Sequence, residues 1–310
     1  MILTTILEPI LEQQYYVKKL YPKTETKAEK VQYNINGKSV NIARILNRFS
    51  SGVFTTGFLG GLKGTYIFNE LRRLKIFNDF IHIKDETKGK LFLFEDDEIL
   101  SIIREDGPRI TREDLASFYD LFSNIVGNFE LVCGAGEIPS GVPKEIYYDL
   151  INISRTKNKK FILDAKGSEL INGIEANPFM VNLDIEDLQN ISKLKLNFEN
   201  EMIKIGKGVL DMGIELVVID LDEKGTIVLD KDRGYRLKIP EIDLTNLKKD
   251  NGYLVAGYTF GIDKRYDFET TIKLGQSFRL AYGQVDNIDI IDMADIKKMM
   301  SYIKISPIYY

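Results

Sequence analysis

Residues 131–164 read LVCGAGEIPSGVPKEIYYDLINISRTKNKKFILD, and this stretch contains the pattern that decides the fold. We expect a short apolar strand at Leu131–Cys133, a helix at Lys144–Ser154 and a second strand at Lys160–Leu163, which ends at Asp164. A strand, a helix and a parallel strand form a βαβ unit, and the same alternation continues toward the C-terminus. The sequence therefore predicts an α/β fold in three layers, with a mostly parallel central sheet flanked by helices.

Two strand-rich segments interrupt this alternation in the N-terminal half. Residues near 12–35 and 80–104 alternate between polar and apolar side chains and are broken by turns, a pattern typical of exposed strands. We expect them to be insertions that form a small β-sheet lid. Residues 1–310 contain no internal repeat and no low-complexity linker, which favours a single domain over the whole range.

Composition excludes several classes of function. The net charge of -4 and the pI near 5.4 make nucleic acid an unexpected partner, and the apolar stretches are too short to cross a membrane. The chain has one cysteine, Cys133, so a disulfide framework is excluded and a cytoplasmic protein is expected. It also has one histidine, His82, which excludes a multi-histidine metal site. We expect both side chains to be structural.

Five motifs occur in order along nearly the whole chain. They are Met1-Ile2-Leu3-Thr4 followed by Glu8-Pro9, residues 36–44 (NGKSVNIAR), Gly57-Phe58-Leu59-Gly60-Gly61, residues 134–142 and residues 246–257. Together they resemble the motifs of the pfkB (ribokinase-like) carbohydrate kinases, in the branch of 1-phosphofructokinase and tagatose-6-phosphate kinase. The resemblance implies a ribokinase-like fold and the transfer of the γ-phosphoryl group of ATP, with Mg²⁺, to a sugar hydroxyl.

The last of these motifs resembles the family's catalytic loop, Asn-Thr-Val-Gly-Ala-Gly-Asp, but its central residues differ. Asn246 and Val255-Ala256-Gly257 match on either side and set the register without a gap. The resemblance then implies that Gly252 takes the position of the aspartate that acts as the catalytic base in the family. Because glycine has no side chain to accept a proton, no catalytic residue is expected to be intact.

The glycines that cradle phosphate in the family are also replaced. The resemblance implies that these positions bind the nucleotide. In this chain they carry Lys249 and Asn251, whose Cβ atoms oppose a tight turn. Between them, Asp250 adds negative charge where phosphate is expected. Asp250 is also a candidate for a displaced catalytic base, if the loop is shifted.

Two further elements of the nucleotide side differ from the family pattern. Asp220 and Asp222 stand in the family's Ser-Leu-Gly turn, and Gly225 is kept, so the resemblance implies that these three positions contact ATP. Asp184 and Asp187 stand where the family has the Asn-x-x-Glu element that organises Mg²⁺. Their carboxylates could hold a hydrated Mg²⁺, or they could simply be the solvated acidic start of a helix.

The residues expected at the sugar-binding end of the site are closer to the family pattern than those at the nucleotide end. The resemblance implies that six residues bind the sugar and its phosphate: Glu12, Lys27, Gly37, Lys38, Asn41 and Lys88. Lys27, Lys38 and Lys88 are expected to converge on one phosphate group, whereas the alternative for Lys27 and Lys88 is that they are solvated charges of the lid.

Two functional hypotheses follow. The first is an ATP-dependent kinase of a hexose phosphate, such as fructose 1-phosphate or tagatose 6-phosphate. The second is a pseudokinase that binds a sugar phosphate or a protein partner. The altered loop at residues 249–252 favours impaired phosphotransfer, and the branch that the chain resembles implies a homodimer formed through the lid.

Overall fold

The computed structural model describes residues 1–49, 52–239, 247–285 and 287–309. Its central sheet contains β1 (Ile2–Ile6), β4 (Val53–Gly60), β5 (Phe77–Ile83), β8 (Leu131–Ala135), β9 (Lys160–Asp164), β10 (Met180–Asp184), β11 (Leu216–Asp220), β12 (Thr226–Asp230), β13 (Gly234–Lys238) and β14 (Lys304–Ile308). The strand order is β14-β13-β12-β11-β10-β9-β8-β1-β4-β5. Neighbours from β5 to β11 are parallel, and β12, β13 and β14 continue the sheet antiparallel.

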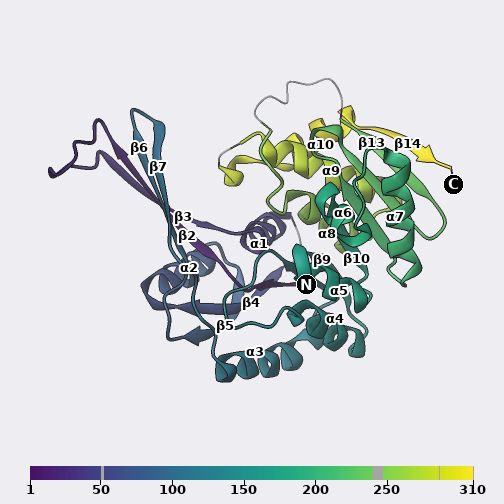
Figure 1. Cartoon of the computed structure of the whole chain (residues 1–310), viewed down its shortest axis with the longest axis horizontal. Helices are drawn as coiled ribbons and strands as arrows, with labels where there is room; N and C mark the ends of the chain where they lie inside the picture. Colours follow the sequence, from purple (N-terminus) through teal and green to yellow (C-terminus); the bar gives the residue numbers. More distant parts are fainter. Residues whose placement is uncertain (50–51, 240–246, 286, 310) are drawn as a thin grey trace.

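Helices cover both faces of this sheet (Figure 1). One face packs against α1 (Lys38–Phe49), α2 (Gly61–Arg73), α8 (Tyr253–Asp263), α9 (Phe268–Gly283) and α10 (Met293–Tyr302). The other packs against α3 (Arg112–Ile125), α4 (Ile146–Thr156), α5 (Gly167–Glu175), α6 (Ile185–Ser192) and α7 (Glu199–Asp211). Because successive side chains of a strand point to opposite faces, Ile2 enters the first core and Leu3 the second. The predicted three-layer α/β fold is confirmed.

A second sheet of four strands projects from the body of the molecule (Figure 1). It contains β2 (Ile10–Val17), β3 (Lys30–Asn36), β6 (Gly89–Glu95) and β7 (Glu98–Arg104), in the order β3-β2-β6-β7. We call these four strands the lid. The predicted lid is therefore present, while the assignment of all 310 residues to one domain stays a prediction.

The predicted boundary of the second insertion, near residue 80, was wrong. Residues 80–83 belong to β5, which pairs with β4 in the central sheet, so the lid segment starts only at Gly89. Phe80 and Ile83 are buried in the two cores. An alternating apolar pattern fits an edge strand of either sheet, which is why the sequence did not separate them. β13 and β14 were also not predicted.

Gly57 marks a place where β1 and β4 approach closely. It is paired with Ile6 and has φ +153°, and an added Cβ would lie 1.8 Å from the carbonyl oxygen of Ile6. That distance is far below a van der Waals contact, so a larger residue would force the two strands apart. The intact glycine of this motif is thus required by the backbone of the sheet.

Replacing Gly57 by alanine is therefore expected to lower the free energy of unfolding by about 3 kcal/mol or more. Gly127→Ala is the matched control, since an added Cβ at Gly127 would meet no atom within 4 Å. Urea unfolding of the two variants measures the difference. Equal stability of the two variants would contradict the close-approach explanation.

Candidate functional site

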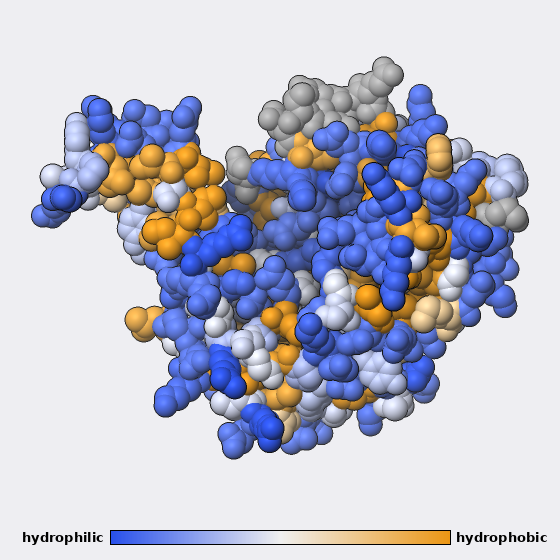
Figure 2. Space-filling model, viewed as in Figure 1, coloured by the Kyte–Doolittle hydropathy of each residue, from blue (hydrophilic) through white to orange (hydrophobic). Residues whose placement is uncertain are grey.

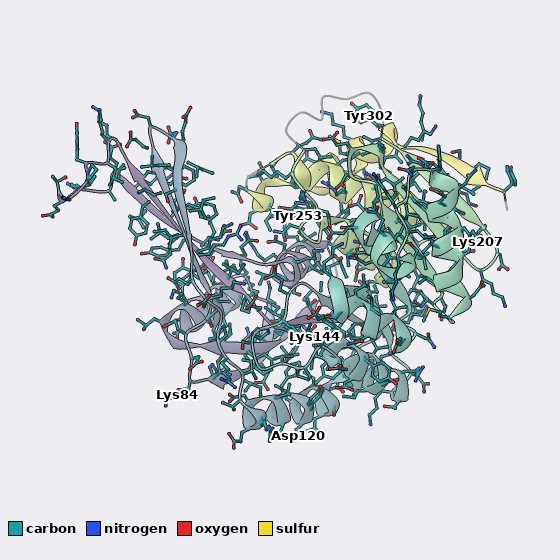
Figure 3. All side chains as sticks on the ribbon, in the orientation of Figure 1. Lys84, Asp120, Lys144, Lys207, Tyr253 and Tyr302 are labelled. Atoms are coloured by element: carbon teal, nitrogen blue, oxygen red, sulfur yellow. The ribbon has the colours of Figure 1, made fainter. Side chains whose placement is uncertain are left out.

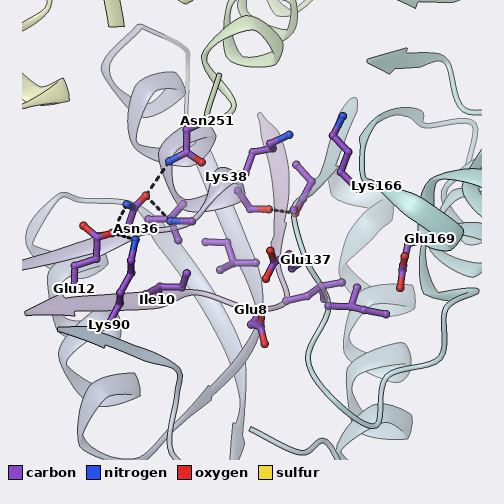
Figure 4. Close-up of a pocket in the computed structure, with 18 residues that line it drawn as sticks. Glu8, Ile10, Glu12, Asn36, Lys38, Lys90, Glu137, Lys166, Glu169 and Asn251 are labelled. Carbon is purple, nitrogen blue, oxygen red and sulfur yellow. Dashed lines mark hydrogen bonds and ion pairs between the residues drawn. The ribbon is translucent and has the colours of Figure 1, made fainter. Parts of the chain in front are cut away.

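A cavity of about 560 Å³ lies at the carboxyl ends of β1 and β8, next to the base of the lid (Figure 4). Its walls come from those strand ends, from the lid strands β2, β3 and β6, and from the start of α1. Lys166, Glu169 and Asn251 complete the lining. Ligands of open α/β sheets bind beyond the carboxyl ends of the strands, so this cavity is the candidate site.

Asn36 is the centre of a hydrogen-bond network at the lid side of the cavity (Figure 4). Its amide nitrogen donates to Glu12 Oε1 at 2.8 Å, and its oxygen accepts from Asn251 Nδ2 at 3.0 Å and Asn41 Nδ2 at 3.2 Å. Asn41 also donates to the carbonyl oxygen of Asn251 at 3.4 Å. The predicted sugar-binding residues Glu12 and Asn41 are thus brought together. Asn36 lies within a quoted motif, but sequence reasoning gave it no role.

Asn251 has a different position from the one expected. Its motif match placed it in the phosphate cradle, but its side chain lines the cavity and reaches the lid side through Asn36. Lys249, the other replaced glycine, is exposed and does not line the cavity. A contact of either residue with a nucleotide stays a prediction.

Lys38 lines the cavity beside Gly37, but its charge is already paired. Its Nζ lies 3.0 Å from Oδ1 of Asp164, whose side chain is fully buried and also accepts from Asn182 at 3.2 Å. Burial opposes the charged ammonium, yet the attraction of Asp164 and Asp250 outweighs it and raises the pKa of Lys38. Lys38 therefore remains protonated and held at the floor of the site.

The three lysines expected to converge on one phosphate are not brought together. Lys88 does not line the cavity, and its charge is paired with two carboxylates that do, Glu8 Oε2 at 2.7 Å and Glu137 Oε2 at 3.2 Å. Lys27 is exposed in the segment between β2 and β3, also outside the cavity lining. Sequence reasoning did not foresee the two carboxylates that neutralise Lys88. The cavity contains a different lid lysine, Lys90, which sequence reasoning missed.

The altered loop leads into α8, whose first residue, Tyr253, lies near the middle of the molecule (Figure 3). Asp250 Oδ2 accepts the N–H of Gly252 at 3.1 Å, and its Oδ1 accepts the N–H of Leu254 at 2.9 Å. The Asp250 side chain is only 8% exposed and does not line the cavity. It therefore caps the helix N-terminus from inside the chain, where the resemblance expects a phosphate.

Gly252, at the position of the family's base, is held in a tight contact between α8 and α1. It has φ +88°, and an added Cβ would lie 2.8 Å from the carbonyl oxygen of Lys38 and 2.7 Å from Ile42 Cγ1. Glycine is thus the residue that this backbone accommodates. Asn246, which set the register of the motif, lies outside the described residues.

A buried arginine, Arg279 of α9, lies between two carboxylates that the resemblance places on the nucleotide side. Its Nε is 3.9 Å from Asp250 Oδ1 and 4.0 Å from Asp220 Oδ2, and its Nη1 donates to the Lys248 carbonyl oxygen at 2.6 Å. Burial, with a further contribution from the charge of Asp250, raises the pKa of Asp220 to about 7. Sequence reasoning missed Arg279, because nothing nearby in the chain marks it.

The turn after β11 is stabilised by its own residues. Asp222 donates its N–H to Asp220 Oδ1 at 2.9 Å, and Gly225 has φ +97°. An added Cβ at Gly225 would lie 2.1 Å from the carbonyl oxygen of Leu237. None of these residues lines the cavity, so a contact with ATP stays a prediction for all three.

The two candidate Mg²⁺ ligands are occupied by other contacts. Asp184 and Asp187 form the capping box of α6, and Lys166 Nζ lies 2.6 Å from Asp184 Oδ2 and also contacts Asp187. Within the described ranges, no group of three or more His, Cys, Asp or Glu side chains could hold a metal ion. These residues do not fit Mg²⁺, because an ammonium group already holds the place of the cation. They form an acidic helix start, as the alternative expected, but Asp187 is only 2% exposed and is therefore not solvated.

Cys133 is buried in the core, whereas His82 is exposed at the surface. Cys133 is buried beside Thr259, and burial raises the pKa of its thiol to about 12. His82 packs edge-on against Phe68.

No helix in the described part of the chain is long and apolar enough to span a membrane. The expectation of a cytoplasmic protein stays a prediction.

Comparisons with known proteins agree on one family. The sequence model of the pfkB family of carbohydrate kinases matches residues 8–278. A 1-phosphofructokinase of Borreliella burgdorferi is 26% identical over 310 residues, which cover 100% of this chain and 99% of that protein. A putative phosphofructokinase of Staphylococcus aureus has a TM-score of 0.90 at 22% identity, covering 99% of each chain. Escherichia coli phosphofructokinase-2 has a TM-score of 0.84 at 18% identity, covering 97% of this chain and 98% of its own.

The position of Asp220 predicts a pH dependence of stability. Its pKa in the folded protein, about 7, lies above the ordinary value of 3.8. Between these two values the folded state keeps a proton that the unfolded state has lost. Stability from this group is therefore fully present below pH 4 and falls as the pH rises toward 7, by at most about 1.4 kcal/mol per pH unit.

Asp220→Asn is expected to flatten the decline in stability between pH 5 and pH 7, because the amide does not titrate. Urea unfolding at pH 5, 6, 7 and 8 measures this, with Asp211→Asn, at an exposed carboxylate of α7, as the control. Identical pH profiles of Asp220→Asn and the wild type would show that Asp220 does not carry the effect.

Proposed function

The chain belongs to the pfkB family of carbohydrate kinases, and we propose on that premise that it binds a sugar phosphate in the cavity at the lid base but transfers phosphoryl from ATP poorly or not at all. The observation that carries this proposal is the Asp250 carboxylate at the N-terminus of α8.

The sugar end supports ligand binding. The cavity of about 560 Å³ falls within the usual size of small-molecule sites. Glu12, Asn36 and Asn251 present carboxylate and amide groups, which suit the hydroxyl groups of a sugar. Since a relative of the whole chain is a 1-phosphofructokinase, fructose 1-phosphate is the first ligand to test, followed by tagatose 6-phosphate.

The nucleotide end supports impaired transfer. A phosphate group at the start of α8 would compete with the Asp250 carboxylate for the same N–H donors and would be repelled by its charge. Gly252 offers no proton acceptor, and loss of a general base costs about 10²–10⁴-fold in rate. Lys166 adds a third obstacle, because it holds the two carboxylates that were candidates for Mg²⁺.

An active hexose-phosphate kinase is the alternative, and family membership favours it. It requires Asp250 to leave the helix N-terminus and act as the base in the cavity. The two functions therefore differ in what Asp250 does, and a variant at this position separates them.

We expect fructose 1-phosphate to raise the melting temperature of the protein and ATP with Mg²⁺ to leave it unchanged. In a coupled assay with hexose monophosphates, turnover should be at least about 100-fold below the 1–100 s⁻¹ that is typical of kinases. Gly252→Asp should not restore turnover, because its Cβ would lie 2.8 Å from the Lys38 carbonyl oxygen. Turnover in the usual range that Asp250→Ala abolishes would establish the kinase instead.

The exposed surface of the lid supports the proposal of a homodimer. Four residues of β7 are exposed apolar side chains: Ile99, Leu100, Ile102 and Ile103. Figure 2 shows hydrophobic surface over the lid. Exposed apolar edge strands promote association, so a second copy of the chain is the proposed cover, and another protein partner is the alternative.

The wild type is therefore expected to sediment as a dimer and Ile102→Lys as a monomer, because the lysine would place a charge in the apolar contact. Ile290→Lys is the control, since Ile290 is 62% exposed on a 3-10 helix (Ile288–Ile290) outside the lid. A monomeric wild type at micromolar concentration would rule out the lid dimer.

A further inference from the structure

Two cations face each other on the lid. Lys90 of β6 and Arg104 of β7 are direct partners in an antiparallel pair. Directly opposed side chains of such a pair point to the same face of the sheet, and Lys90 lines the cavity. Like charges at directly opposed positions destabilise a sheet. The arrangement is unfavourable in the ligand-free protein, and an anion between the two groups would relieve it.

The charges of this pair are poorly matched by neighbouring carboxylates. The carboxylate closest to Lys90 Nζ is that of Glu12, at 4.0 Å, and its Oε1 already accepts a hydrogen bond from Asn36. Lys90 also lies 4.4 Å from the ring centre of Phe92. Arg104 is exposed, and its charge acts on the Glu137 carboxylate, but no close ion pair joins it to a residue that the structure describes.

The other lysines around the cavity differ in this respect. Lys38 has Asp164 at 3.0 Å, Lys88 has Glu8 at 2.7 Å, and Lys166 has Asp184 at 2.6 Å. A phosphate would have to break those contacts before it could bind there. It could approach Lys90 and Arg104 without breaking a short ion pair.

We propose that Lys90 and Arg104 clamp the phosphate group of the ligand, in place of the lysines that the sequence indicated. This inference rests on the proposed function and names the residues that recognise the phosphate. The ligand's sugar would lie toward Glu12, Asn36 and Asn251, which line the cavity next to Lys90 (Figure 4). A guanidinium group can bind two phosphate oxygens at once, and Lys90 adds a point charge.

Isothermal titration calorimetry tests the clamp with fructose 1-phosphate, tagatose 6-phosphate and unphosphorylated fructose. Lys90→Gln and Arg104→Gln should each raise the Kd of the sugar phosphates by about tenfold or more, because each loses a charge-assisted contact. The affinity for fructose should stay the same. The ligand-free Arg104→Gln variant should melt no lower than the wild type, since the substitution removes a repulsion.

Lys30→Gln is the matched control, because Lys30 is an exposed lysine of β3 in the same sheet, outside the cavity lining. If both clamp variants bind the sugar phosphates within twofold of the wild type, the clamp is wrong and the proposed function stands. If the wild type binds none of these sugar phosphates at millimolar concentration, the proposed function fails and the clamp fails with it.

Discussion

The two hydrogen bonds from the backbone N–H groups of Gly252 and Leu254 to the Asp250 carboxylate organise the candidate site. The first turn of a helix leaves N–H groups without partners, and they need an acceptor when they are buried. A ligand could supply that acceptor, but here the chain supplies it. Because the carboxylate is buried, its pKa is raised, and the cations Lys38 and Arg279 oppose that shift. This carboxylate also lies 3.9 Å from Arg279 Nε, and its charge adds to the effect of burial in raising the pKa of Asp220.

The same principle extends along the carboxyl ends of the parallel strands. Asp164 follows β9 and pairs with Lys38, while Asp184 and Asp187 at the end of β10 pair with Lys166. Each of these three carboxylates has a cation from the same chain within contact distance. In the proposed function, these internal ion pairs leave fewer free groups for a nucleotide and a metal ion. The lid side of the cavity differs, because its amide and carboxylate groups remain exposed to a ligand.

The glycines have two separate roles in this chain. At Gly57 and Gly225 the absence of a side chain allows strands and turns to approach, which is a requirement of the fold. At Gly252 the glycine allows α8 to pack against α1, and it also removes the expected base. A glycine in a family motif can therefore reflect a requirement of the fold, as at Gly57, or bear on the expected function, as at Gly252.

The sequence by itself determined the α/β class, the lid and the family, because these depend on periodicity and on motifs that keep their order along the chain. It also pointed to the altered loop, to Glu12 and Lys38, which line the cavity, and to Asn41, which donates to Asn36. Only the tertiary structure decided which charges are free. Lys88 and Lys166 are each paired with carboxylates distant in sequence, and Arg279 reaches Asp250 and Asp220 from another helix. The availability of a charged group depends on burial and on neighbours across the fold, and no local pattern of residues contains that information.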